Sequence, residues 1–279
     1  SQIRVETVMS SEFQYSSELL DENSVLIAIS QSGETADVLQ SVKAAREKGA
    51  KILSIVNVTT SSLARISDCF LEVKCGPEIG VAATKSFTSQ LSIIYFIADT
   101  IGSNLTGIST NRMELSKAIE KSLELESKIA EFAAQIKDAK DIYILGRSNH
   151  FPICLEGALK IKELAYIHAE GIAAGELKHG PLALIDKNSV VIFLNPDDST
   201  YIDTLSNAHV VKSRGARLIG ITNKPHSIYD YCIPIPNVRE SLLPMLEVIP
   251  LQILAYHLAL HNNANPDYPR NLAKCVTVR

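Results

Sequence analysis

An internal repeat is the feature that most constrains the fold of this chain. One copy, residues 24–57, reads SVLIAISQSGETADVLQSVKAAREKGAKILSIVN, and the other, residues 189–222, reads SVVIFLNPDDSTYIDTLSNAHVVKSRGARLIGIT. The two match with a single one-residue shift before Gly215. Each reads as a strand, a polar turn, a helix that stops at Gly-Ala and a basic residue, and a second strand. We interpret the repeat as a duplicated βαβ unit, although a convergent unit would share the pattern.

Short β-rich runs alternate with longer helical patterns along the chain, which predicts an α/β protein with parallel sheets. Five nearly continuous apolar runs predict strands covered on both faces: residues 25–30, 52–57, 141–146, 189–195 and 217–222. The helical patterns cover residues 35–48, 84–101, 113–137, 151–167, 200–214 and 240–261. The charged stretch from Met113 to Lys140 has no strand signal, so we expect it to join two domains.

Composition excludes several classes of protein. The 279 residues carry a formal net charge of -4, which removes the electrostatic attraction that nonspecific nucleic-acid binding requires. The five cysteines are odd in number, widely spaced and without a CxxC pair, so they indicate neither a disulfide framework nor a zinc site and favour a reducing, cytosolic setting. No apolar run approaches the ~20 residues that span a bilayer, and no secretory leader is recognisable, so we expect no membrane association.

The polar turns of the two repeat copies differ in chemistry. The first reads Ser30-Gln31-Ser32-Gly33-Glu34-Thr35, which places hydroxyls and a glycine where a strand gives way to a helix, a setting that holds phosphate. The second, residues 195–199, contains a proline and two carboxylates that would repel an anion. The first turn contains neither of the usual nucleotide-binding motifs, G-x-x-x-x-G-K-[ST] and G-x-G-x-x-G. We therefore expect it to bind one compact phosphomonoester, such as that of a sugar phosphate. The alternative is that Ser32 or Thr35 merely caps the helix.

A second constellation lies in residues 151–181. Glu156, Lys160 and Glu163 share one helix face at i, i+4 and i+7, and such a group could move protons. The alternative is a solvated ladder of salt bridges. A glycine-rich loop follows, which holds His179, the side chain whose unperturbed chemistry suits acid/base work at neutral pH. The neighbouring acidic and basic residues of this loop are Glu170, Glu176 and Lys178, and three further histidines, His168, His257 and His261, are interpreted as structural.

Five segments together closely resemble the isomerase half of the glucosamine-6-phosphate synthases, which is built from two sugar-isomerase (SIS) domains. They are SQSGETADVL (30–39), EIGVAATKSFTSQL (78–91), LEGALKIKELAYIHAEGIAAGELKHGPLALID (155–186), PLQILAYHLAL (250–260) and PRNLAKCVTV (269–278). The resemblance implies two flavodoxin-like α/β/α domains, each a parallel sheet flanked by helices. It places the first domain at residues 1–107, a helical connection at 108–138, the second domain at 139–268 and a tail over the active site at 269–279.

The resemblance also implies a cytoplasmic enzyme of amino-sugar biosynthesis that makes glucosamine 6-phosphate from fructose 6-phosphate and ammonia derived from glutamine. It assigns the sugar phosphate to the turn, the C1-to-C2 proton transfer to Glu163 with its helix neighbours beside it, and imine formation to Lys274. His179 would assist ring opening from the neighbouring subunit of a homodimer. Neither a cofactor nor a metal ion is implied. By motif position the phosphate-binding residues are Ser30, Gln31, Ser32 and Thr35, the residues beside Glu163 are Lys160 and Glu156, and the backbone contacts to sugar are Val81 and Ala273.

The sequence departs from the family pattern in three places. Ala83 stands where the family usually has serine. The family's first isomerase strand, with a Cys-Gly-Thr-Ser turn, is expected before Ile3 and is absent, so we expect a first domain that is truncated at its N-terminus. The glutaminase domain is also absent, so we expect no glutamine hydrolysis by this chain. Two alternatives stay open: another SIS sugar-phosphate isomerase or deglycase, and a module that binds a sugar phosphate without turnover.

Overall fold

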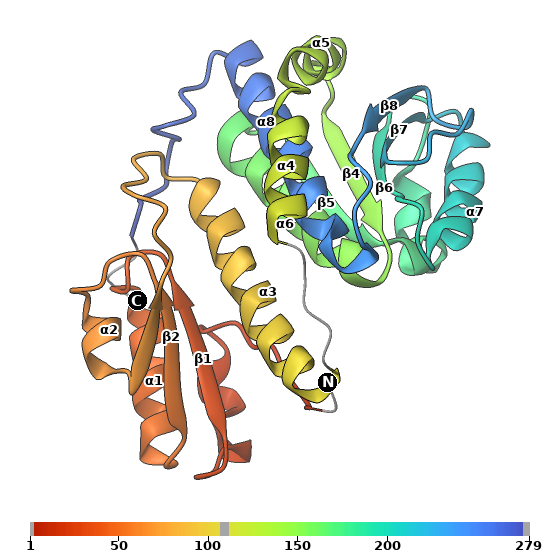
Figure 1. The fold of residues 1–279 in the computed structure, drawn as a ribbon. Helices are drawn as coiled ribbons and strands as arrows, with labels where there is room; N and C mark the ends of the chain where they lie inside the picture. The colour runs from red at the N-terminus through yellow and green to blue at the C-terminus, as the bar shows by residue number, and fades with distance from the viewer. Residues whose placement is uncertain (1–2, 107–111, 276–279) are drawn as a thin grey trace. The chain divides into compact units, whose positions relative to one another are not determined.

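The computed structural model describes residues 3–106 and 112–275, which fold as two compact units (Figure 1). The first unit comprises residues 1–110 together with 271–279, and the second comprises residues 111–270. The C-terminal tail therefore belongs to the first unit, and the charged stretch after residue 111 belongs to the second.

The first unit is built on a three-stranded parallel sheet of order β1-β2-β3. Helices α1 and α2 pack against it through a core that includes Val42, Ala45, Ile52 and Leu63. Two short 3-10 turns, Phe13–Tyr15 and Ser17–Leu19, precede the sheet. The elements are β1 (Val25–Ser30), α1 (Ala36–Glu47), β2 (Lys51–Val56), α2 (Ser62–Ile66), β3 (Cys69–Glu72) and α3 (Lys85–Thr106).

The second unit holds a five-stranded parallel sheet of order β5-β4-β6-β7-β8, the flavodoxin-like doubly wound arrangement. Its strands are β4 (Asp141–Gly146), β5 (His168–Ala173), β6 (Val190–Leu194), β7 (Arg217–Thr222) and β8 (Tyr231–Pro234). Its helices are α4 (Arg112–Leu123), α5 (Glu126–Ile136), α6 (Phe151–Ala165), α7 (Tyr201–Lys212) and α8 (Leu243–His261). Short 3-10 turns lie at Ser148–His150, Ala174–His179, Pro181–Leu184 and Glu240–Leu242. Every residue of β6 is buried, which explains its unbroken apolar run.

The repeated sequence folds in the same way twice. Val25 pairs with Lys51 in the first unit as Val190 pairs with Arg217 in the second. The side chain of Asp68 accepts a hydrogen bond from the Ile52 amide at 2.7 Å, and at the equivalent place Asp230 accepts one from the Leu218 amide at 2.8 Å. The two turns that precede β1 and β6 also match, since Asp21 accepts from the amide of Asn23 and Asp186 from that of Asn188.

The structure differs from the predicted secondary structure in two ways. The pattern over residues 113–137 predicts one helix, but the chain forms α4 and α5, with a turn at Glu124 and Leu125, and both helices pack against α8. The strands β3, β5 and β8 are not predicted. They lie at sheet edges, where half-exposed residues break the continuous apolar run that marks a central strand.

Helix α8, with the short turn before it, corrects a third expectation. Residues Glu240–His261 are long and apolar enough to cross a membrane by length and composition, although the sequence predicts no such segment. In the structure 78% of its most apolar window is buried. It packs on α5 and α6, so its composition is that of a core helix.

Candidate functional site

The serine-rich turn lies at the carboxyl end of β1 and leads into α1. Ser30 Oγ accepts a hydrogen bond from the Gly33 amide at 3.0 Å and lies 3.1 Å from Thr35 Oγ1. Ser32 Oγ accepts one from the Glu34 amide at 3.2 Å. The backbone oxygen of Gln31 accepts from the amide of Asn57, which follows β2. The structure therefore brings all four predicted phosphate-binding residues into one turn at the edge of the sheet.

Gly33 is required by the shape of this turn. Its φ of +69° lies in the left-handed region, and a Cβ at this position would meet Ser61 Oγ at 2.1 Å. Ser61 is buried and caps α2 by accepting from the Ala64 amide. The turn is thus packed directly against the start of the second helix.

Thr35 occupies the N-cap position of α1 but makes no side-chain capping hydrogen bond. Its hydroxyl lies next to that of Ser30 instead. This geometry does not fit the alternative that Thr35 merely caps the helix, and it leaves two adjacent hydroxyls at the positive end of the helix dipole.

The C-terminal tail is fastened to the first unit beside this turn. Lys274 Nζ donates to Glu78 Oε2 at 2.8 Å and to the Gly80 carbonyl at 2.7 Å. Cys275 Sγ lies 3.2 Å from Ser32 Oγ. The predicted imine-forming lysine therefore directly precedes the tail residue that contacts the predicted phosphate turn. Its neighbour Ala273 is exposed, and Val81, which follows Gly80, is half-buried.

Glu78 is a residue to which the sequence analysis gives no role. Its carboxylate also accepts from the amides of Thr84 and Ser86, both at 3.1 Å, and from Ser86 Oγ at 2.6 Å, at the start of α3. Burial by itself raises the pKa of Glu78, but the hydrogen bonds from Lys274 and Ser86 outweigh burial and lower it. A carboxylate shortly before a helix is the one sequence signal that could have found it.

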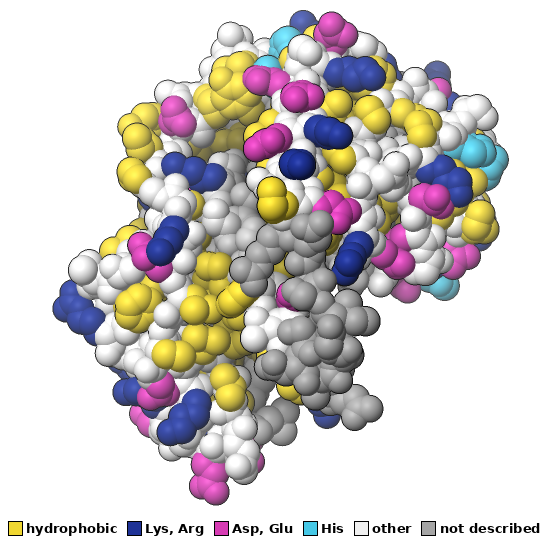
Figure 2. All heavy atoms as spheres, viewed as in Figure 1, with side chains coloured by type: hydrophobic (Ala, Val, Ile, Leu, Met, Phe, Trp, Pro, Cys, Tyr) yellow, Lys and Arg dark blue, Asp and Glu magenta, His cyan; other side chains and the backbone are white. Residues whose placement is uncertain are grey.

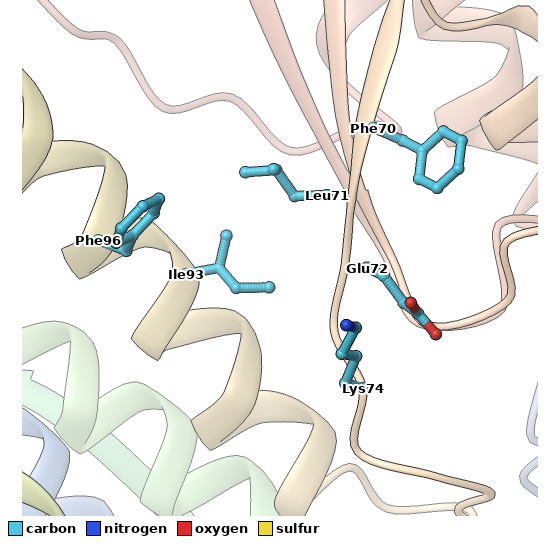
Figure 3. Close-up of a pocket in the computed structure, with 6 residues that line it drawn as sticks. All are labelled: Phe70, Leu71, Glu72, Lys74, Ile93 and Phe96. Carbon is cyan, nitrogen blue, oxygen red and sulfur yellow. The ribbon is translucent and has the colours of Figure 1, made fainter.

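Two hollows border the first unit's sheet. The larger, about 590 Å³, lies at the carboxyl ends of β2 and β3, next to the turn through Asn57. The smaller, about 390 Å³, lies between β3 and α3, where Figure 3 shows Leu71 pointing toward Ile93 and Phe96. Phe70, Leu71, Ile93 and Phe96 line the smaller hollow together with two charged residues, Glu72 and Lys74. The larger one is lined by Asn57, Val58, Thr59, Thr60, Glu72, Lys74, Gly76 and Pro77.

The acid/base group of the second unit lies on α6. Lys160 Nζ is 2.5 Å from Glu163 Oε2 and 3.5 Å from Glu156 Oε1. Lys160 is only 2% exposed, so this group is not a solvated ladder of surface salt bridges. Burial raises the pKa of Glu156; Lys160 opposes the shift and Glu163 adds to it. The three predicted side chains are therefore together and largely withdrawn from water.

His179 ends the 3-10 turn Ala174–His179 and is exposed. Within residues 3–106 and 112–275, no hydrogen bond or ion pair joins it to the Glu-Lys-Glu group. The structure of this single chain does not bring His179 together with the other predicted catalytic residues.

A second buried charge cluster, centred on His150, was not predicted. His150 Nδ1 lies 2.8 Å from Glu247 Oε2, and Nε2 lies 2.6 Å from Asp198 Oδ2. Burial opposes the charged imidazole, but the hydrogen bonds and charges of Glu247 and then Asp198 raise the pKa of His150 to about 9. His150 follows β4 and Asp198 follows β6, so the cluster fills the switch point of the sheet, where such folds usually bind ligands.

A family model described as "SIS domain" matches residues 1–99 and 135–262 of this chain. The chain belongs to the SIS domain family. The two matched segments correspond to the two sheets, so the fold predicted from the resemblance is confirmed. The five cysteines of this SIS chain are all free.

The chain is similar to glutamine–fructose-6-phosphate aminotransferase [isomerizing] of Pyrococcus horikoshii, with 46% identity over 96% of this chain and 46% of that protein. Among solved structures it resembles the C-terminal domain of glucosamine-fructose-6-phosphate aminotransferase from Francisella tularensis, with a TM-score of 0.89 and 33% identity over 96% of this chain and 79% of that one. It also resembles a glucosamine-6-phosphate deaminase from Thermotoga maritima, with a TM-score of 0.82 and 27% identity over 96% and 80%. The SIS chain spans about half the length of the curated relatives that it matches.

Proposed function

We propose that this chain performs the isomerase reaction of the aminotransferases to which it is similar: fructose 6-phosphate and ammonia give glucosamine 6-phosphate. The observation that carries this proposal is Lys274 Nζ, which is held against Gly80 while the next residue, Cys275, contacts the phosphate turn. A module that only binds a sugar phosphate needs the hydroxyl turn. An amine beside that turn is what a ketose needs to form an imine.

In the proposed reaction, the Ser30–Thr35 turn binds the phosphate and His179 assists opening of the sugar ring. The neutral amine of Lys274 adds to the C2 carbonyl of the open-chain ketose, and loss of one water gives an imine. Ammonia then replaces the lysine nitrogen at C2. Glu163 removes a proton from C1, which gives an enolamine, and then returns a proton to C2, while the proton of the C1 hydroxyl passes to the nitrogen; the product has an aldehyde at C1 and an amine at C2. Lys160 stabilises the Glu163 carboxylate before the first transfer and after the second.

Further parts of this proposal concern the assembly. We propose a homodimer in which His179 acts in the site of the partner subunit, in keeping with its exposure on its own chain. Ammonia would come from glutamine through a glutaminase domain of the kind that the resemblance implies. The setting proposed is cytoplasmic, and the reaction as written uses neither a cofactor nor a metal ion.

The test is the Glu163→Gln variant, assayed for conversion of fructose 6-phosphate with ammonium chloride as the nitrogen source. We expect kcat to fall about 10²- to 10⁴-fold with little change in KM, because the side chain keeps its shape and loses its basicity. Glu176→Gln is the matched control, since Glu176 is an exposed glutamate in the 3-10 turn that follows β5. Unchanged turnover of Glu163→Gln in an active protein would show that the base is wrongly assigned.

A second candidate function, deamination, is favoured by the likeness to the Thermotoga maritima deaminase. The same residues would then run the chemistry in the opposite direction and release ammonia from glucosamine 6-phosphate. The two candidates are separated by supplying each substrate alone. Ammonia release from glucosamine 6-phosphate, without glucosamine 6-phosphate formation from fructose 6-phosphate and ammonium, supports the deaminase.

A further inference from the structure

Within the described part of the chain, Lys274 links the C-terminal tail to the loop that precedes α3 through Glu78 and the Gly80 carbonyl. They are 196 positions apart in sequence, yet their side chains meet at 2.8 Å. The Glu78 side chain is 5% exposed and that of Lys274 is 28% exposed, so the pair is largely shielded from water. A shielded pair with this geometry fixes both partners far better than a surface salt bridge does.

Glu78 is itself rigidly held, because three donors at the start of α3 bind its carboxylate. One oxygen, Oε1, takes the amides of Thr84 and Ser86, and the other, Oε2, takes Ser86 Oγ and Lys274 Nζ. The position of the lysine nitrogen is therefore set by a helix terminus of the first unit and not by the tail alone. The Gly80 carbonyl supplies the second acceptor for Nζ.

We propose that Glu78 is a positioning residue for Lys274: its carboxylate and the Gly80 carbonyl fix the lysine nitrogen one residue before Cys275, which contacts the phosphate turn. This inference rests on the proposed function, because it assigns a task to the same lysine. Without the carboxylate, the lysine side chain keeps only the Gly80 carbonyl as an acceptor and is no longer held in one position.

Other ionisable groups near Glu78 do not replace it in this task. The Lys85 ammonium donates to the Pro77 carbonyl at 2.6 Å. The Cys75 thiol lies near enough for the Glu78 charge to affect it, but burial is the main cause that raises its pKa. Cys275, on the tail, contacts Ser32. The carboxylate at position 78 is thus the anionic partner of Lys274.

The test is the rate of chemical acylation at Lys274 at one fixed pH, measured by mass spectrometry without any substrate. In Glu78→Gln the amide oxygen can still accept from the Thr84 and Ser86 amides, so α3 keeps its start, but the negative charge is gone. We expect acylation of Lys274 to become about threefold faster or more, because the lysine nitrogen is no longer held by a shielded carboxylate. Glu78→Asp should restore most of the difference.

Asp68→Asn is the matched control, because Asp68 also accepts from a backbone amide and pairs with a cation in the first unit, but its partners, Ile52 and Arg46, are not in the tail. The rate of acylation at Lys274 in this variant should equal that of the wild type. Equal rates for the wild type and Glu78→Gln would overturn the inference.

A second measurement separates this inference from the proposed function. Borohydride reduction in the presence of fructose 6-phosphate should trap an adduct at Lys274, and Glu78→Gln should lower the maximal trapping rate about tenfold or more, with Glu78→Asp restoring most of it. A change in the acylation rate without any adduct in the wild type leaves Glu78 as the residue that holds Lys274 but refutes the imine chemistry. An adduct whose trapping rate is unchanged in Glu78→Gln refutes the positioning role alone.

Discussion

The two units start from the same repeat and differ in what surrounds it. On β6 of the second unit, Val190, Ile192 and Leu194 are 5%, 0% and 0% exposed. Their register equivalents on β1, which are Val25, Ile27 and Ile29, are 63%, 40% and 40% exposed. In the second unit β4 pairs with the free side of β6, whereas among the described residues β1 pairs only with β2. Figure 2 shows hydrophobic side chains gathered over the sheet of the first unit.

The turns at the ends of these equivalent strands diverge in the same way. After β1 the chain presents hydroxyls and a left-handed glycine, and Ser32 of this turn contacts Cys275 of the tail. After β6 it presents Asp198, whose carboxylate already forms a buried hydrogen bond with His150. One repeat therefore keeps an open polar turn suited to an anion, and the other fills the corresponding place with its own side chains. Local sequence sets the strand and the helix, but neighbouring elements decide whether the turn between them is free for a ligand.

The largest expected effect concerns the cluster that fills the second switch point. His150→Ala removes the cation between two buried carboxylates, and we expect it to lower the free energy of unfolding of the second unit by about 3 to 5 kcal/mol. Native-state hydrogen exchange of the β4 and α8 amides measures this unit separately from the first. His168→Ala is the matched control, since the His168–Asp141 pair is exposed and should cost less than about 1 kcal/mol. Similar losses of unfolding free energy in both variants would show that the buried cluster contributes no more to stability than an exposed ion pair does.

The next effect compares the equivalent strands directly. Ile192→Ala deletes a fully buried side chain, and we expect a cost of about 2 to 5 kcal/mol, measured by urea unfolding. Ile27→Ala removes the equivalent side chain from a surface that is already 40% exposed, so less area returns to water and the cost should be clearly smaller. If Ile27→Ala costs as much as Ile192→Ala, the β1 face is covered in solution, and the difference between the units is not intrinsic to the folded chain.

A smaller effect is the pH dependence of stability. The pKa of His150 in the folded chain is about 9, above its unfolded value of 6.5. When folding raises the pKa of a histidine, its protonated form stabilises the folded chain fully at pH values below the unfolded pKa. This contribution is lost as the pH rises through the folded pKa. Burial also raises the pKa of Glu247, which acts in the same direction. We expect the second unit to lose stability between pH 7 and pH 9.5, and His150→Gln to lose less over that interval. An equal loss in both proteins would contradict this assignment.

Much of the fold was predictable from sequence, and the reasons for the misses are physical. The five strands that were predicted lie in continuous apolar runs, whereas the edge strands β3, β5 and β8 carry polar or half-exposed residues and give no such signal. The turn and the Glu156–Lys160–Glu163 face were found because local spacing alone brings their residues together. Glu78 and His150 were missed because their partners, Lys274 and Glu247, lie 196 and 97 positions away.

The most direct test of the difference between the two units is calorimetric titration of the whole chain with glucosamine 6-phosphate. The double variant Ser32→Ala and Thr35→Val removes hydroxyls from the first turn, and Ser199→Ala removes the hydroxyl from the second. Unphosphorylated glucosamine, titrated in parallel, reports binding that does not depend on phosphate. We predict that the first variant weakens binding of the phosphate ester at least tenfold and that Ser199→Ala leaves Kd within twofold of the wild type. Equal affinities for the wild type and the first variant, or a selective loss in Ser199→Ala, would contradict the assignment of the phosphate to the first unit.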